Sequence, residues 1–74
     1  MFILINGTNY NIYSISSFSK ETAYVTNSDG TGLNKYFINY AITTGIALKE
    51  EFDTEASRDA KYDLLVEKFV VDNN

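Results

Sequence analysis

The chain has 74 residues, a net charge of −4, and neither cysteine nor histidine. A domain of this size buries only about 60 % of the surface that its unfolded chain exposes, so it is marginally stable unless disulfides, a metal or oligomerisation help. The lack of cysteine excludes disulfides and thiolate ligands, and the lack of histidine removes the commonest general base and metal ligand. We therefore expect one domain over residues 1–74 that is stabilised by oligomerisation or by a well-packed core.

The charge is unevenly distributed along the chain. Residues 1–49 hold two acids against three lysines, a net of +1, whereas residues 50–74 hold eight acids against three bases, a net of −5. An acidic C-terminal segment is either a solvated face or a surface that meets a basic partner or mimics a polyanion. No apolar run approaches the ~20 residues that span a membrane, so we expect a cytoplasmic protein without a membrane partner.

The first predicted element is an antiparallel hairpin of residues 2–5 and 9–13. Asn6 and Gly7 lie between the two segments. An Asn-Gly pair in this position is the strongest short hairpin signal, because both turn residues take positive φ. The first strand, FILI, is apolar at every position, which predicts a central strand covered on both faces.

The next part of the chain gives a weaker signal. Residues 15–19 are either a third short strand or an irregular link, whereas residues 22–26 (TAYVT) alternate as a strand does. The NSDGTG segment at 27–32 is a loop by composition, since it holds two glycines and three turn-forming residues.

Residues 35–42 alternate clearly, and one face of this predicted strand carries Tyr36, Ile38, Tyr40 and Ile42. After a turn, residues 46–52 run back with three side chains predicted to point inward, namely Ile46, Leu48 and Phe52. Repeated hairpins of this kind predict an α+β fold. We expect an antiparallel β-meander of four or five strands over residues 2–52, with one C-terminal α-helix packed on one face.

The C-terminal helix is predicted over residues 54–70, because Asp53 and Thr54 supply capping oxygens just ahead of a helical pattern. One face of this helix carries an apolar stripe that is expected to cover the sheet, with the aliphatic stem of Arg58 lying along it. The stripe consists of Tyr62, Leu65, Val66 and Phe69.

A second, weaker apolar line lies on another side of the same helix. It consists of Ala56, Ala60 and Leu64, with Glu55 beside it in the first turn. The line is either two small residues and a tolerated surface leucine, or a place where another element approaches closely. That element is the same helix of a second copy or a different protein. We expect self-association.

The sequence carries no recognisable catalytic motif. Nucleophilic catalysis needs a nucleophile with a positioned base, and the serines between residues 14 and 19 have no histidine to serve them. A carboxylate pair such as Glu50 and Glu51 could act without histidine, but a solvated surface is its ordinary explanation. We therefore expect neither an enzyme nor a cofactor or metal site.

Two features could serve binding. The loop around Asp29 fails the spacing of both the phosphate-binding and the EF-hand loop, so it is either a plain hairpin loop or a partner contact. Tyr36 and Tyr40 share a strand face, and exposed aromatics on a sheet can stack single-stranded bases. That mode needs surrounding cations, which are few here, so a protein-binding or small-ligand surface is the alternative.

The run FILINGTNYNI, followed much later by EEFDTEASRDAKYDLLVEKF, resembles a loose class of short uncharacterised proteins of AT-rich bacteria and their phages. Members of that class pair a hairpin meander with one C-terminal helix. The resemblance implies binding and blocking of a host protein, including immune effectors, or sequestration of a signalling molecule. It assigns no functional residues.

We therefore predict a small non-enzymatic interaction protein, such as a phage-type inhibitor that binds a host immune protein, and a homo-oligomer. The alternative hypothesis is an oligomeric protein that binds or sequesters a small anionic ligand or nucleotide, and the third hypothesis is single-stranded nucleic-acid binding. The predicted contact residues are Glu55, Ala56, Ala60, Leu64, Asp29, Tyr36 and Tyr40.

Overall fold

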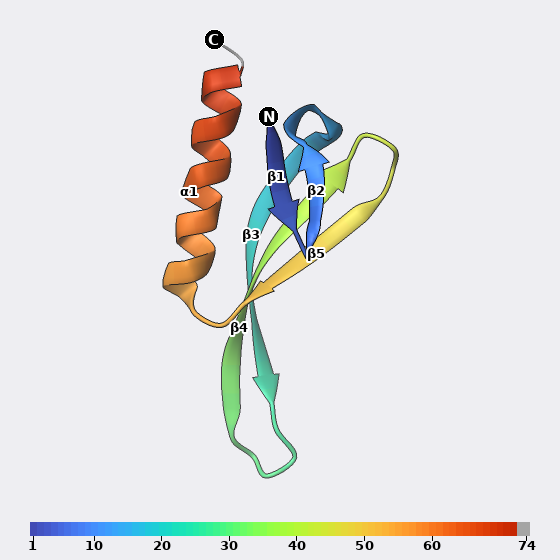
Figure 1. Cartoon of the computed structure of the whole chain (residues 1–74). Helices are drawn as coiled ribbons and strands as arrows, with labels where there is room; N and C mark the ends of the chain where they lie inside the picture. Colours follow the sequence, from blue (N-terminus) through green and yellow to red (C-terminus); the bar gives the residue numbers. More distant parts are fainter. Residues whose placement is uncertain (73–74) are drawn as a thin grey trace.

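The computed structural model describes residues 1–72 and contains five strands, one 3₁₀ turn and one helix. The strands form a two-stranded sheet, β1–β2, and a three-stranded sheet in the order β3–β4–β5, and every pairing is antiparallel. Figure 1 shows their arrangement, which confirms the predicted α+β fold. The bounds are β1 Phe2–Ile5, β2 Thr8–Asn11, η1 Ile12–Ser14, β3 Ile15–Thr26, β4 Gly32–Ile42, β5 Ala47–Phe52 and α1 Glu55–Asp72.

The first hairpin turns at Asn6 and Gly7, whose φ angles of 50° and 82° are the positive values that the Asn-Gly signal predicts. The prediction that β1 is covered on both faces is wrong. Phe2 and Leu4 are 62 % and 53 % exposed, because the β1–β2 hairpin turns only the face with Ile3 and Ile5 to the core. The second strand ends at Asn11, whose side chain accepts from the backbone N–H of Tyr13 and begins the 3₁₀ turn.

The uncertain segments 15–19 and 22–26 belong to one strand, β3, of 12 residues. It runs unbroken because β4 offers a partner along its whole length, starting at Gly32 rather than at residue 35. The inward position predicted for Ile46 is wrong, since this residue lies just before β5 and is 56 % exposed.

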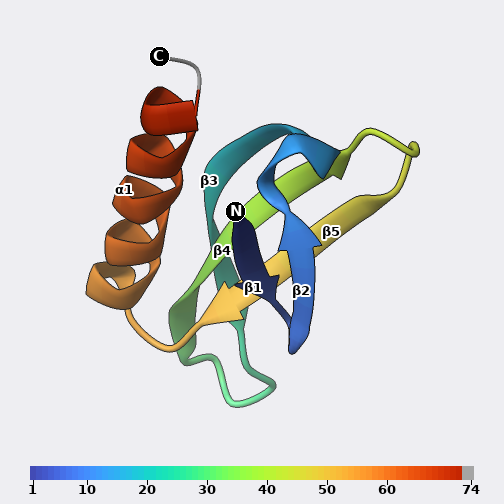
Figure 2. The same ribbon diagram turned by 45° about the horizontal axis from the view of Figure 1, so that its top comes forward.

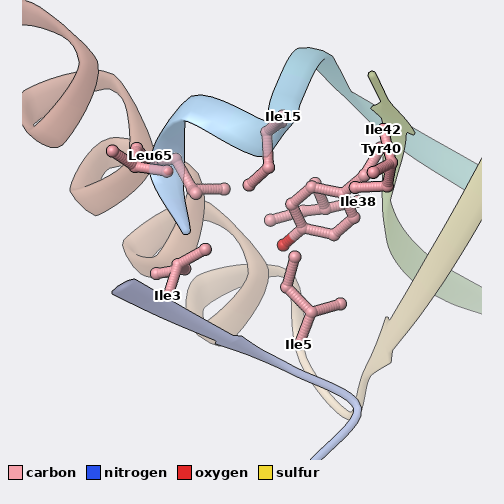
Figure 3. Close-up of a cluster of buried hydrophobic side chains, with 8 residues drawn as sticks. Ile3, Ile5, Ile15, Ile38, Tyr40, Ile42 and Leu65 are labelled. Atoms are coloured by element: carbon pink, nitrogen blue, oxygen red, sulfur yellow. The ribbon is translucent and has the colours of Figure 1, made fainter. Parts of the chain in front are cut away.

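The alternation predicted for β4 is confirmed, because Ile38, Tyr40 and Ile42 are buried. The β1–β2 hairpin and α1 both pack on this face of the three-stranded sheet (Figure 2). Figure 3 shows how the buried side chains of these three units converge. The core consists of Ile3, Ile5, Ile12, Ile15, Ile38, Tyr40, Ile42 and Leu65.

Helix α1 begins where the sequence predicts, because the hydroxyl of Thr54 accepts from the backbone N–H of Ser57. Its apolar stripe reaches the sheet through the ring of Tyr62, whose centroid lies 5.3 Å from that of Phe18. Val66 departs from the prediction, since it is 40 % exposed at the border of the stripe.

Arg58 is a buried cation at the N-terminal end of α1, with 5 % exposure. Its Nη1 donates to the backbone oxygen of Glu21 at 2.9 Å and to Oγ1 of Thr22 at 3.0 Å. The guanidinium also lies 5.4 Å from the ring centroid of Tyr36. These contacts fix the start of the helix to β3 and β4.

Beyond Thr22 and Tyr36, the β3–β4 hairpin continues without a third strand, because β5 pairs only with Tyr36–Ala41 of β4. We call residues 22–36 the arm. It projects from the rest of the molecule in Figure 1 and accounts for the long axis of 49 Å, against 25 and 18 Å in the other directions. Within residues 1–72, no helix has both the length and the apolar character needed to cross a membrane.

Two adjacent leucines of α1 test this packing. Leu65 is fully buried and Leu64 is 42 % exposed. We expect Leu65→Ala to lower the free energy of unfolding by about 2–5 kcal/mol, because it leaves a cavity under the helix. The matched control Leu64→Ala should change it by less than about 0.5 kcal/mol. Chemical denaturation measures both, and equal losses would contradict the assigned helix face.

Candidate interaction surface

The side chains of Tyr40, Glu50 and Lys61 form a largely buried polar cluster between the sheet and α1. Lys61 Nζ donates to both Glu50 carboxylate oxygens, at 3.2 and 3.1 Å, and to the backbone oxygen of Leu4 at 2.6 Å. The hydroxyl of Tyr40 donates to Glu50 Oε1 at 2.7 Å. All three groups are therefore engaged with one another.

Burial raises the pKa of the Tyr40 phenol well above its ordinary value, and the hydrogen bond to Glu50 and the charge of that carboxylate act in the same direction. A phenol that keeps its proton is neither a nucleophile nor a base near neutral pH. We assign the cluster to holding β1, β4, β5 and α1 together.

The opposite face of the three-stranded sheet carries neither the helix nor the first hairpin, and we call it the open face. The register places a half-buried Phe37 at its centre, with Glu21 and Glu51 directly opposite on the two neighbouring strands. Its members are Ser17, Ser19, Glu21, Ala23, Val25, Leu33, Lys35, Phe37, Asn39, Ala41, Ala47, Lys49 and Glu51.

Charged and polar side chains on the open face are paired with each other. Asn39 Nδ2 donates to Glu21 Oε1 at 2.7 Å, and Lys49 Nζ lies 3.3 Å from the same oxygen. The hydrogen bond from Asn39, and then the one from Lys49, lower the pKa of Glu21. Lys49 Nζ also sits 4.7 Å from the ring centroid of Phe37, and Lys35 lies 3.8 Å from Glu51. The result is an aromatic centre between two ion pairs.

The arm extends the open face with apolar side chains. Val25 and Leu33 are directly opposite each other on β3 and β4, and they are 36 % and 47 % exposed. Tyr24 is 68 % exposed on the other face of the arm. Its ring lies across Gly32, where a Cβ atom would displace the phenol end of the ring. The arm therefore displays apolar groups on both of its faces.

The loop at the tip of the arm is built by its own hydrogen bonds. Asp29 Oδ1 accepts from the backbone N–H and the hydroxyl of Thr31, at 3.0 and 2.6 Å, and these bonds lower the pKa of Asp29. Asn27 Nδ2 donates to the same hydroxyl at 3.1 Å. The carboxylate of Asp29 thus shapes the loop. Among the side chains that the structure describes, no three or more of His, Cys, Asp or Glu form a cluster suited to a metal.

The structure does not bring the sequence-predicted contact residues together. Glu55, Ala56, Ala60 and Leu64 lie exposed on α1, and Glu55 is 3.6 Å from Arg58 Nη2. Asp29 belongs to the loop between β3 and β4, and this loop lies at the tip of the arm, away from α1 (Figure 1). Of the two tyrosines, Tyr36 is half-buried on the covered face and Tyr40 is in the core at 2 % exposure.

The placement of the two tyrosines argues against the hypothesis that they bind single-stranded nucleic acid. The face that carries Tyr36 and Tyr40 is covered by α1 and the first hairpin, so these rings do not form an exposed platform. Each lysine of the sheet has a carboxylate within 4 Å, because Lys20 pairs with Asp59, Lys35 with Glu51 and Lys49 with Glu21.

The sequence reasoning missed Val25 and Leu33 as surface residues. The alternation of residues 22–26 predicts the strand that holds Val25, but Leu33 lies between the predicted loop at 27–32 and the predicted strand at 35–42 and is assigned to neither. Only the pairing of β3 with β4 shows that the two side chains face the same way.

Comparison of the chain with family models, with curated proteins and with solved structures finds no match. The resemblance to short meander-plus-helix proteins of bacteria and phages stays a prediction from the two end segments. The surface that the geometry offers for contact is the open face together with the arm.

The polar cluster predicts a pH dependence. Folded Tyr40 keeps its proton above pH 10.0, where the phenol of the unfolded chain loses it, so the unfolded state then binds fewer protons. Above that pH the free energy of unfolding should fall by up to about 1.4 kcal/mol per pH unit. Below it, the stabilisation that comes from the protonated Tyr40 is fully present.

Tyr40→Phe should flatten this fall in denaturant titrations at a series of pH values. It should also lower the free energy of unfolding at pH 7 by about 1–2 kcal/mol, because Glu50 loses a donor. Tyr24→Phe, which removes a hydroxyl from an exposed ring, is the matched control. An equally steep fall in the Tyr40→Phe variant would contradict the assignment.

Proposed function

We propose that the chain is a small non-enzymatic protein that binds a protein partner through the open face and the arm. The observation that carries the proposal is the exposure of Tyr24, Val25 and Leu33 on a hairpin that projects beyond the core. Aromatic and apolar side chains in the centre of a surface, with polar groups around them, are typical of protein interfaces.

The surroundings of these side chains support this proposal. The ion pairs Lys35–Glu51 and Lys49–Glu21 flank Phe37 on the open face and provide a polar rim. A rim of this type contributes little affinity but selects partners by charge. Binding of a small anionic ligand or nucleotide draws less support, because the same two lysines already have carboxylate partners.

An inhibitor that blocks a host immune protein needs a contact surface and no chemistry of its own. The arm suits such a role because its two strands reach outside the body of the molecule and can enter a concave site on a partner. We place this activity in the cytoplasm, where a chain without disulfides is at no disadvantage. We also propose that the chain forms a homo-oligomer, since a domain of this size is marginally stable alone.

Leu33→Lys tests the proposed surface, and Leu64→Lys is its matched control, because the two leucines are 47 % and 42 % exposed on different faces. Tagged wild type and variants would capture partners from a host lysate, and the affinity for the captured protein would then be measured with purified components. We expect Leu33→Lys to weaken binding at least about tenfold, as the loss of a central apolar contact does.

Leu64→Lys should bind as the wild type does. Undiminished binding by Leu33→Lys, with loss of binding by Leu64→Lys, would move the partner site to the helix. Circular dichroism of both variants establishes that they fold, and neither substitution touches the core.

A further inference from the structure

The outer edge of β3 in the arm has hydrogen-bonding groups without a strand beside them. The hairpin closes with a bond from the backbone N–H of Asn27 to the oxygen of Thr31, so the odd-numbered residues of β3 bond to β4. The even-numbered residues of the arm, Thr22, Tyr24 and Thr26, therefore direct their N–H and C=O groups away from β4. Nothing in residues 1–72 makes a backbone hydrogen bond to these outward groups.

This edge lacks the devices that normally protect an exposed strand. Natural edges carry lysine, proline or a bulge, whereas residues 22–26 (TAYVT) contain no charge and no proline, and the β3–β4 register is regular there. The segment consists of β-branched, aromatic and small residues, which favour strand pairing. Such an edge is suited to accept another strand.

Helix α1 limits where that strand can lie. Arg58 bonds to Glu21 and Thr22, and Lys20 lies 3.6 Å from Asp59 of the helix. The body of the molecule therefore occupies β3 up to Thr22, and the uncovered part of the edge runs from Thr22 to Thr26.

We propose that this edge pairs with the same edge of a second copy, antiparallel and centred on Tyr24. The proposal rests on the homo-oligomer part of the proposed function and names its contact. In this register Tyr24 faces Tyr24 of the second copy and Thr22 faces its Thr26, and these pairs exchange six backbone hydrogen bonds. The Ala23 side chain meets Val25 of the other copy on the open face.

The charges of this edge do not oppose a second copy. Asp29 is the one charged residue between positions 22 and 34, and it lies at the tip, so no like charges face each other between the paired segments. Registers centred on Thr22 or Ala23 would extend the paired strand to Lys20 or beyond, where α1 lies beside β3. The register centred on Tyr24 instead ends its pairing at Thr22 and uses the uncovered part of the edge.

The resulting dimer has one six-stranded sheet, in the order β5–β4–β3–β3–β4–β5, with both open faces on the same side. The twofold axis is perpendicular to the sheet, so the contact is closed and does not propagate into a fibre. Each arm is then supported along its outer edge, which a two-stranded hairpin alone lacks.

Thr26→Pro tests the contact. The substitution removes an N–H that points away from β4, so the β3–β4 ladder keeps all its bonds while the ring blocks the second strand. Thr26→Val keeps the N–H and the shape and is the matched control. Sedimentation equilibrium should give the wild type and Thr26→Val twice the 8.4 kDa mass of one chain. The self-association constant of Thr26→Pro should be at least about tenfold weaker.

Hydrogen exchange on the wild type keeps the test independent of any variant. The amides of Thr22, Tyr24 and Thr26 should gain protection as protein concentration rises. Those of Gly32 and Asn34, which point out of the opposite edge of the arm, should not. If the Thr26→Pro variant is still a dimer, or if the wild-type dimer shows no protection of the three β3 amides, the β3 edge contact is wrong. Either result would still be compatible with self-association through another surface. A wild type that is monomeric at every concentration would overturn both.

Leu64→Lys separates this contact from the helix contact expected from the sequence, because it should leave the mass of the dimer unchanged. Leu33→Lys should also remain dimeric, since its side chain lies on the open face and away from the β3 edge. Failure of partner capture by Leu33→Lys and failure of dimerisation by Thr26→Pro are therefore separate results.

Discussion

The ion pair between Lys61 and Glu50 joins three parts of the molecule that are far apart in the sequence. Lys61 comes from α1, Glu50 from β5, and the backbone oxygen of Leu4, which accepts from the same ammonium group, comes from β1. Both side chains are less than 20 % exposed, so removal of either partner would leave a poorly solvated charge. The hydroxyl of Tyr40 uses the remaining acceptor capacity of the carboxylate and extends the network into the centre of the sheet.

This network and the arginine at the start of α1 bring the helix and the first hairpin onto one face of the sheet. A chain of 74 residues has enough apolar side chains for one such core, and the core residues accordingly lie on one side of β4. The open face and the arm are what this arrangement leaves uncovered. Their exposed side chains, Tyr24, Val25 and Leu33, are therefore available for contacts with other molecules.

The two proposed contacts use different parts of the same arm. Partner binding uses side chains that point out of the open face and of the two faces of the arm, whereas self-association uses backbone groups along the β3 edge. Because side chains stand perpendicular to a sheet and backbone groups lie in its plane, one surface does not obstruct the other. A dimer of this kind presents two partner surfaces side by side, which strengthens binding to a partner with repeated sites.

Short runs of residues are sufficient to predict the local features of this protein. The Asn6-Gly7 turn, the alternation that buries Ile38 and the cap at Thr54 each follow from a few neighbouring residues. Strand pairing decided the rest, because burial and exposure depend on which segments meet. The FILI strand has an exposed face because only its Ile3 and Ile5 side packs on the core, and Tyr40 is core because two elements cover its side of the sheet. The arm exists because β5 is shorter than β4, a difference in pairing length that no local pattern encodes.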